Sequence, residues 1–186
     1  MISTSDFRKG AKIEYKGAPH EIIDFQHHKM GRGGAIVRTK LKNLKTGSIF
    51  DDSFKGGEKF KTPNLEERSM QYLYNDGELY HFMDKENYEQ TPLTEAQLGD
   101  ARKFLIENMT VKILFYIAEP IAVELPIFVE LKIEKTDPGF KGDTASGGSK
   151  PAVLESGVTV KVPFHLSEGD IVKVDTRTSE YIERVK

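Results

Sequence analysis

Hydrophobic and polar positions alternate in short runs along almost the whole of this 186-residue chain. Such alternation is typical of β-strands that bury one face, and turn-forming Gly, Asn, Asp and Pro residues separate the runs. The runs are AKIEY, HEIIDF, AIVRTKLKNL, SIFDDSF, EKFKT, VELKIEKT, GVTVKVPF and DIVKVDTRTSEYIERV, with two longer stretches, SMQYLYNDGELYHFMD and VKILFYIAEPIAVELP. This pattern predicts an all-β protein built from small barrels or sandwiches.

The two longer stretches each predict a pair of strands. In the first, Asn75-Asp76-Gly77 indicates a hairpin, because Asp-Gly supplies the positive φ angles that a type I′ turn needs. In the second, we expect a break at Glu119-Pro120 to separate the two strands.

Residues 91–108 predict a helix instead of a strand. Thr94 and Gln97 have the spacing of a capping box. Three apolar residues then share one face at helical spacing: Leu98, Ala101 and Leu105. Gly99 costs such a helix about 1 kcal/mol relative to alanine, so we expect a short helix that depends on tertiary packing. A helix that plugs a five-stranded barrel is common in OB-type folds, but a surface helix fits the pattern equally well.

Charge divides the chain into three parts of similar length. Residues 1–64 carry 13 Lys and Arg against 7 Asp and Glu, residues 65–127 carry 5 against 12, and residues 128–186 carry 9 against 10. Turn residues at Thr62-Pro63-Asn64 and Leu125-Pro126 fall at the same two places. We therefore expect three consecutive small β-barrels with these boundaries, each near the lower size at which a domain folds alone.

The uneven distribution of charge matters more than the net charge of −2. The basic first third is a candidate for phosphate contact, since counterion release drives the binding of cationic surfaces to nucleic acid. The acidic middle third would be repelled by phosphate, so we expect it to face protein, solvent or a cationic partner. The alternative to an interpretation in terms of binding partners is that the charges cluster by chance.

Several functional classes find no support in the sequence. The chain has no cysteine, which excludes disulfides, thiol catalysis and cysteine-bound zinc. His27 and His28 are adjacent and would point to opposite faces of a strand, and no other histidines have metal-binding spacing. Common hydrolase, phosphate-loop and dinucleotide-binding motifs are absent, as are long apolar runs and a secretion signal. We expect a cytoplasmic protein that is not an enzyme and needs no cofactor or metal.

Residues 27–35, HHKMGRGGA, carry the clearest candidate chemistry. They join a strand ending near His27 to one starting near Ala35, and three glycines around Arg32 make the backbone thin and permissive. Further basic residues lie on or near this hairpin: Lys29, Arg38, Lys40 and Lys42. A cationic hairpin tip suits a phosphate-lined cleft, and a modifying enzyme can reach it. An exposed turn with an incidental arginine fits the spacing equally well.

Residues 138–152, PGFKGDTASGGSKPA, form a long stretch rich in Gly, Ser and Pro. Because it lies inside the third part of the chain, we expect an exposed loop rather than a linker. Long loops on compact domains are often functional.

The order of these features resembles bacterial elongation factor P over essentially the whole chain. A basic first domain is followed by the Gly-Arg-Gly-Gly-Ala tip at 31–35, by DPGFKGDTASGGSKPA, and by VKVPFHLSEGDIVKVDTRTSEYIERV at the end. The resemblance implies an SH3-like (KOW-type) first domain and two OB-fold domains, in an L-shaped arrangement similar in outline to a transfer RNA. It also implies a monomer.

The resemblance further implies a translation elongation factor that binds the ribosome between the peptidyl and exit tRNA sites. Such a factor relieves stalling at consecutive prolines, and its first-domain hairpin reaches toward the acceptor end of the peptidyl-tRNA, among rRNA. The implied tRNA-binding residues are Lys29, Gly31, Arg32, Gly33, Gly34 and Ala35. The implied ribosome- and mRNA-binding residues are Gly142, Asp143, Thr144, Tyr181 and Arg184. For Tyr181 a structural role, capping the last barrel, is the alternative.

Arg32 stands where many members of the family carry a lysine that is extended by a β-lysyl group. A guanidinium is not the amine acceptor that this chemistry needs. Arg32 resembles a subset of the family in which a tip arginine receives rhamnose. The resemblance thus implies an arginine rhamnosyltransferase as a partner, with a nucleotide-rhamnose donor. A general RNA-binding module without ribosome specificity is the alternative function.

Overall fold

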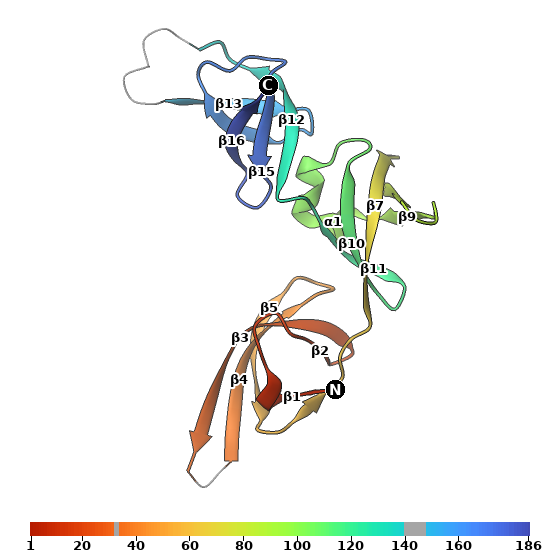
Figure 1. Cartoon of the computed structure of the whole chain (residues 1–186), viewed down its shortest axis with the longest axis vertical. Helices are drawn as coiled ribbons and strands as arrows, with labels where there is room; N and C mark the ends of the chain where they lie inside the picture. The colour runs from red at the N-terminus through yellow and green to blue at the C-terminus, as the bar shows by residue number, and fades with distance from the viewer. Residues whose placement is uncertain (32–33, 140–147) are drawn as a thin grey trace. The chain divides into compact units, whose positions relative to one another are not determined.

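The structure is a computed structural model that describes residues 1–31, 34–139 and 148–186, with the backbone alone at Met30. These residues form a four-stranded sheet, a two-stranded sheet and two five-stranded sheets, with very little helix (Figure 1). The expected all-β class is therefore confirmed.

The chain divides into two compact units. Unit 1 comprises Met1–Glu67 and Leu114–Ala122, and unit 2 comprises Arg68–Ile113 and Val123–Lys186. A short stretch from the middle of the sequence therefore packs with the first 67 residues.

The main sheet of unit 1 has four antiparallel strands in the order β2-β3-β4-β5. Their bounds are Lys12–Tyr15 (β2), Ala18–Met30 (β3), Gly34–Asn43 (β4) and Ile49–Lys55 (β5). A smaller sheet pairs β1 with β6, and the 3-10 helix η1 follows β1; the bounds are Ile2–Ser3 (β1), Thr4–Asp6 (η1) and Lys59–Phe60 (β6). In β4 the sequence alternation is realised directly, since Val37, Thr39 and Leu41 are buried and Arg38 and Lys40 between them are exposed.

An apolar core anchors these strands. Its buried members are Phe7, Ile13, Ile22, Val37, Leu41, Phe54 and Phe60. The ring centroids of Phe7, Phe54 and Phe60 lie 4.7 to 6.1 Å apart, and such aromatic pairs stabilise a core by roughly 0.5–1.5 kcal/mol beyond their buried area. The core extends along the sheet toward the β3–β4 turn as far as Val37 and Phe54, which pair with each other.

The middle of the chain forms a five-stranded sheet in the order β11-β10-β7-β8-β9. The bounds are Leu65–Asn75 (β7), Tyr80–Asp84 (β8), Gln90–Leu93 (β9), Thr110–Tyr116 (β10) and Glu119–Glu124 (β11). The last part of the chain forms a second such sheet in the order β14-β13-β12-β15-β16. The bounds are Phe128–Thr136 (β12), Ser149–Leu154 (β13), Thr159–Pro163 (β14), Ile171–Asp175 (β15) and Glu180–Val185 (β16). Both sheets place their first strand at the centre, between the second and the fourth, as OB folds do.

The hairpin predicted at Asn75-Asp76-Gly77 is confirmed, but its turn type is not. Asn75 pairs with Tyr80, so four residues form the loop, and of the three predicted turn residues only Gly77 has a positive φ, at 104°. The Gly77 N–H donates to Asn75 Oδ1 at 2.6 Å, an arrangement that replaces the type I′ turn.

The predicted break at Glu119-Pro120 is wrong. These two residues begin β11, and the turn lies one step earlier at Ile117 and Ala118, which have φ angles of 49° and 63°. Pro120 fits there because β11 is an edge strand, where a missing N–H is tolerated.

The predicted helix is only one turn long. The capping box is confirmed, since Gln97 N donates to Thr94 Oγ1 at 3.3 Å and Thr94 N donates to Gln97 Oε1 at 2.8 Å. The α-helix α1 covers Glu95–Leu98, and the 3-10 helix η2 continues over Gly99–Phe104. Gly99 breaks the α-helix because its φ and ψ of 55° and −133° are not helical.

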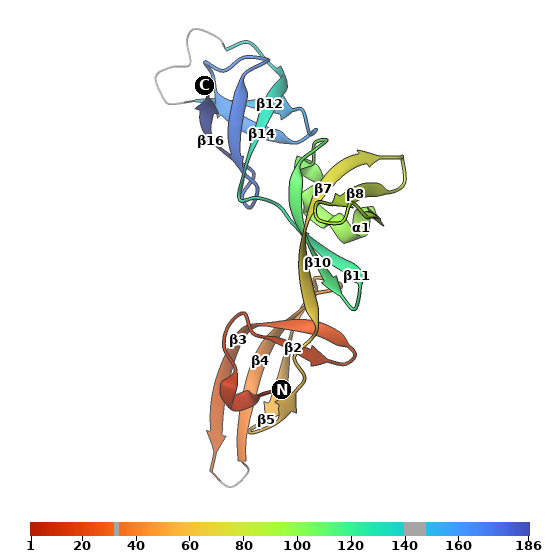
Figure 2. The same ribbon diagram turned by 45° about the vertical axis from the view of Figure 1, so that its right-hand side comes forward.

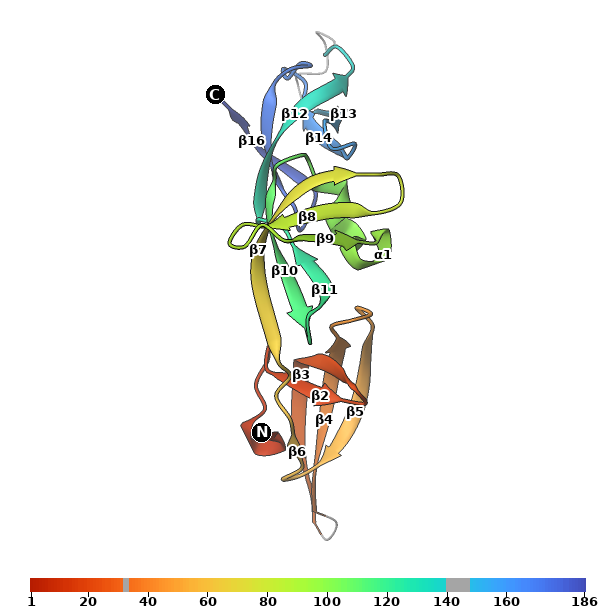
Figure 3. The ribbon, with the colours of Figure 1, turned by 90° about the vertical axis from the view of Figure 1, so that its right-hand side faces the viewer.

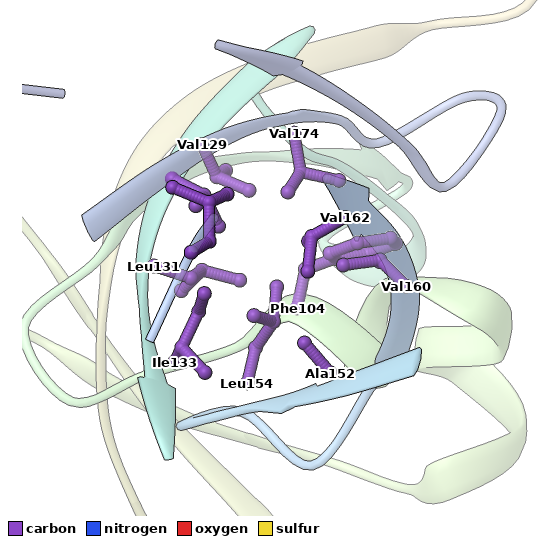
Figure 4. Packing of buried hydrophobic residues seen from close by; sticks show 11 residues of the cluster. Phe104, Val129, Leu131, Ile133, Ala152, Leu154, Val160, Val162 and Val174 are labelled. Carbon is purple, nitrogen blue, oxygen red and sulfur yellow. The ribbon is translucent and has the colours of Figure 1, made fainter. Parts of the chain in front are cut away.

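The helical segment does fill a barrel end, but with a residue outside the predicted face. Leu98, Ala101 and Leu105 are buried as expected. Phe104 joins the core of the C-terminal sheet (Figure 4), whose other buried members are Val129, Leu131, Ile133, Ala152, Leu154, Val160, Val162, Leu166, Val172 and Val174. One residue from the middle part of the sequence therefore belongs to the core of the C-terminal sheet.

The loop predicted over residues 138–152 is wrong at its C-terminal end, and residues 140–147 of it lie outside the described residues. Ser149–Leu154 forms β13, and Lys150 and Ala152 on this strand are buried. The Gly, Ser and Pro content of the stretch hid this strand from the sequence pattern.

Candidate functional site

The β3–β4 hairpin extends beyond the barrel of unit 1. Pairing continues to Lys29 with Ala35 and to Met30 with Gly34, the last described pair before the turn. Three views show the two strands reaching past β2, β5 and β6 (Figures 1, 2 and 3). The sequence placed the strand ends near His27 and Ala35, so the paired part of the hairpin is longer than predicted.

The outer end of the hairpin is exposed. On β3, Gln26, His27, His28 and Lys29 are consecutive and all exposed. On β4, Val37 pairs with His27 and is buried in the core, so the hairpin is free of the barrel only beyond this pair, where Lys29 and Ala35 face each other and are both exposed. A narrow element of this kind can enter a cleft with both faces in contact with its walls.

The structure brings most of the predicted tip residues together. Lys29, Gly31, Gly34 and Ala35 lie at the hairpin end and are exposed, whereas Arg32 and Gly33 lie outside the described residues. Gly34 has a φ of 81°, in the left-handed region that glycine adopts without strain.

Gly56 supports the hairpin and was not singled out from the sequence. Its N–H donates to the Ala35 carbonyl at 2.7 Å, just beyond the last pair of β4 and β5. A Cβ added at Gly56 would lie 2.9 Å from the Ala35 Cβ, so the close approach requires glycine here. The Gly56-Gly57 pair indicated a turn, and nothing in that signal pointed to a contact with the tip.

The outer face of β3, β4 and β5 carries mixed charge. A depression of about 530 Å³ is lined there by the exposed cations Arg38 and Lys40 together with Asp24 and Asp51. The Lys9 ammonium lies 3.0 Å from Asp24 Oδ1 and, by hydrogen bonding, lowers the pKa of Asp24. Asp52 also lines the depression and lies 3.6 Å from the Lys16 ammonium, so Arg38 and Lys40 share this face with three carboxylates, of which Asp24 and Asp52 are paired with other cations.

The predicted ribosome-binding residues of the C-terminal part differ in their surroundings. Gly142, Asp143 and Thr144 lie outside the described residues. Tyr181 is half-buried and packs against the C-terminal core, as the structural alternative predicted, but it also lines a surface depression of about 680 Å³. The Arg184 Nη2 lies 2.9 Å from Asp170 Oδ1, so this guanidinium is held in an ion pair.

The depression beside Tyr181 also includes described residues that follow the Gly-Asp-Thr sequence. Gly148 and Ser149, the first described residues after that sequence, line it together with Lys161. The structure thereby brings one predicted contact residue and the loop end to the same surface.

In the part of the chain that the structure describes, no three His, Asp or Glu side chains are grouped so that they could hold a metal ion. Of the described helices, none has the length and apolar composition that crossing a membrane requires.

Models of one protein family match nearly all of the chain in three consecutive parts. The elongation factor P KOW-like domain matches residues 3–60, the elongation factor P OB domain matches 65–123, and the elongation factor P C-terminal model matches 129–184. Elongation factor P of Thermodesulfovibrio yellowstonii is 58% identical over 186 residues, with 100% of both chains covered. The chain belongs to the elongation factor P family. Elongation factor P of Natranaerobius thermophilus is 56% identical, over 100% of this chain and 99% of the relative.

This member of the elongation factor P family is therefore a translation elongation factor. The KOW-like and OB matches agree with the expected first and middle folds. A solved structure described as eukaryotic translation initiation factor 5A from Methanococcus jannaschii is similar in fold, with a TM-score of 0.56 and 21% identity over 66% of this chain and 92% of that one.

Proposed function

We propose that this elongation factor binds the ribosome beside the peptidyl-tRNA and stimulates peptide-bond formation at consecutive prolines by positioning the tRNA acceptor end. The observation that carries the proposal is the long β3–β4 hairpin, which is paired as far as Met30 and Gly34, is exposed at Lys29 and Ala35, and carries the further exposed cations Arg38 and Lys40. Membership of the elongation factor P family supports it.

The proposed mechanism is alignment rather than proton transfer. The proline ring fixes φ near −65° and makes the attacking nitrogen a secondary amine, which narrows the geometries that can react. Holding reactants in line can supply up to roughly 7–11 kcal/mol of a barrier in favourable model systems. A rigid hairpin that steadies the acceptor end can therefore speed the step without giving or taking a proton.

In this proposal Arg32 is the positioning group at the tip, and Lys29, Gly31, Gly33, Gly34 and Ala35 contact the tRNA with it. A guanidinium stays charged throughout the physiological range and suits phosphate. We further propose that an arginine rhamnosyltransferase extends Arg32 from a nucleotide-rhamnose donor. The exposure of Gly31 and Gly34 on either side supports access to the tip. Intact-mass and peptide mass spectrometry of protein from its native host should show one deoxyhexose on Arg32.

The remaining parts of the chain would bind the ribosome and so place the hairpin beside the tRNA. We propose domains at 1–64, 65–127 and 128–186, in a cytoplasmic monomer. Contacts to the ribosome and mRNA would come from Gly142, Asp143, Thr144, Tyr181 and Arg184. The depression that brings Tyr181 and Ser149 together supports a contact surface at this end of the third domain.

The test is an in vitro translation assay with a consecutive-proline reporter. Arg32→Ala should lower the stimulation at least about tenfold, a change of roughly 1.4 kcal/mol, because it removes the tip cation. Ribosome co-sedimentation should change little, since the docking surfaces are intact. The matched control is Arg8→Ala, an exposed arginine near the Ile22 end of β3, which should stimulate like the wild type. Full stimulation by Arg32→Ala, or binding to arbitrary RNA as tight as to ribosomes, would contradict the proposal.

A further inference from the structure

A lysine of the C-terminal sheet has its side chain in the interior. Lys150 is 6% exposed and lies on the core-facing side of β13, in line with the buried Ala152 and Leu154. Its Nζ donates to the Asp137 carbonyl oxygen at 2.6 Å. An apolar side chain at this position would fill the same space without the desolvation that a buried ammonium requires, so packing alone does not explain the lysine.

The local backbone explains why the Asp137 carbonyl needs a side-chain donor. The ladder between β12 and β13 ends at Thr136 and Ala152. The next residue on β13 is Pro151, and Pro138 follows Asp137 on the other side. Neither proline has an N–H, so the backbone cannot extend the ladder through these residues. The Lys150 ammonium supplies a hydrogen bond between the two segments at the point where the ladder stops.

Phe164 packs against both segments near these residues, at Gly139 and Gly148. A Cβ added at Gly139 would lie 2.5 Å from the Phe164 carbonyl oxygen, and one added at Gly148 would collide with the Phe164 ring. Both glycines are thus packed directly against one residue, which follows the end of β14. Lys150 and Phe164 together fasten residues 137–139 and 148–150 to the barrel and to each other.

We propose that Lys150 is a positioning residue, which fixes where the segment that carries Gly142, Asp143 and Thr144 leaves the third domain. This rests on the proposed function, in which these three residues contact the ribosome and mRNA. Because Ser149 and Tyr181 line the same depression, release of the loop end would also alter the surroundings of Tyr181. Lys150 itself contacts no RNA in this proposal and acts through the loop.

The first arm of the test needs no ribosome. In the full-length Lys150→Met variant, amide hydrogen exchange of peptides covering 136–139 and 148–150 should become at least about tenfold faster, while β15 stays protected. The control is Lys132→Met, an exposed lysine on β12, which should leave exchange at the loop ends unchanged. Unchanged exchange at the loop ends in Lys150→Met overturns the proposal.

A second variant covers the case in which Lys150→Met unfolds the barrel and β15 loses protection as well. Gly148→Ala keeps Lys150 but forces the loop end away from the Phe164 ring. It should accelerate exchange at the same two ends with β15 intact. If Gly148→Ala leaves the loop ends as protected as in the wild type, the proposed fastening is wrong.

The second arm separates positioning from the role of the tip. Lys150→Met should raise the factor concentration for half-maximal stimulation of the proline reporter roughly five- to tenfold, with the maximal stimulation preserved. Arg32→Ala should instead lower the maximum. An unchanged half-maximal concentration in Lys150→Met refutes the functional part of the inference. If the wild type itself fails to stimulate, the proposed function is wrong, and the exchange arm still decides whether Lys150 holds the loop ends.

Discussion

Single residues on this protein differ in how firmly their neighbours hold them. Arg184 is paired with Asp170, and Lys150 is tied to a backbone carbonyl, whereas Lys29 at the hairpin end is exposed. Held side chains have a fixed direction, and exposed long side chains keep their conformational freedom until a partner orders them. Lys29, which is proposed to contact the tRNA, is of the second kind, whereas Arg184, which is proposed to contact the ribosome, is already held in one direction by Asp170.

Asp175 is a firmly held residue whose contribution depends on pH. It ends β15, and Arg177 donates to its two oxygens from Nη2 at 2.7 Å and from Nε at 3.1 Å. These side-chain hydrogen bonds lower the pKa of Asp175 to about 2. A depressed carboxylate pKa stabilises the fold above its ordinary value near 4, and this stabilisation is lost as the pH falls toward 2.

The prediction is that Asp175→Asn is less stable than the wild type at pH 7, by a margin that shrinks below about pH 4 and disappears near pH 2. Urea unfolding followed by circular dichroism at several pH values measures this margin. The control is Glu130→Gln, an exposed carboxylate on β12. A margin that stays constant from pH 7 to pH 2 would show that the pair with Arg177 does not lower the Asp175 pKa.

At the scale of elements, the chain uses glycine to end helices and proline to end ladders. Gly99 stops α1 after one turn, and Pro138 and Pro151 stop the β12–β13 ladder. Near each interruption a side chain connects two parts of the fold, since Phe104 enters the C-terminal core and Lys150 bridges to Asp137. The breaks in regular structure are therefore also the places where elements are joined.

Gly99→Ala tests whether the backbone conformation at residue 99 requires α1 to end there. Helix propensity alone would favour alanine by about 1 kcal/mol. The φ of 55° and ψ of −133° are instead strained for any residue with a Cβ, so we expect a loss of roughly 1–3 kcal/mol of unfolding free energy. An added Cβ meets no atom within 4 Å, so steric crowding would not account for the loss.

Chemical denaturation measures the change in Gly99→Ala. Ala96→Gly, in the middle of α1, serves as the control and should cost at most about 1 kcal/mol. Stabilisation by Gly99→Ala would mean that the helix runs on through residue 99.

The sequence allowed the strands and the capping box to be predicted because both depend on neighbouring residues. Alternation located β4 and β12, and Thr94 with Gln97 located the start of α1. The features that the sequence did not predict depend on contacts between residues that are distant in the sequence. β13 has a loop-like composition and forms because β12 and β14 pair with it on either side.

The candidate site likewise has features that local sequence predicts and features that it does not. The hairpin was predictable, since glycines around a cation form a local turn signal, and the role of its tip stays a prediction. Gly56 and Lys150 were missed, because each matters through one residue far away in the sequence, Ala35 and Asp137 respectively. The turn at Ile117 and Ala118 was also missed, since neither residue favours a positive φ.

Across the whole molecule, Phe104 connects the middle part of the sequence to the core of the C-terminal sheet, and we expect the stability of that sheet to depend on it. Its ring is 2% exposed among the buried residues of the C-terminal sheet (Figure 4). Phe104→Ala should therefore cost about 3–5 kcal/mol, the usual range for emptying a buried phenylalanine site. The loss should appear in β12 and β15, although residue 104 belongs to the middle part of the sequence.

Native-state hydrogen exchange of full-length Phe104→Ala measures this dependence strand by strand. Ile182→Ala, at a residue that is 46% exposed on β16, is the control and should change protection little. Unaltered protection of β12 and β15 in Phe104→Ala would mean that the C-terminal barrel is stable without the ring.

The central claim, that the hairpin tip steadies the acceptor end of the peptidyl-tRNA, is tested most directly by electron cryomicroscopy. The full-length protein would be imaged on a ribosome paused at consecutive prolines. We expect residues 29–35 to lie against the terminal nucleotides of the peptidyl-tRNA, with the Arg32 side chain within contact distance. Density that places residues 29–35 away from these nucleotides, with the rest of the chain bound, would contradict the claim.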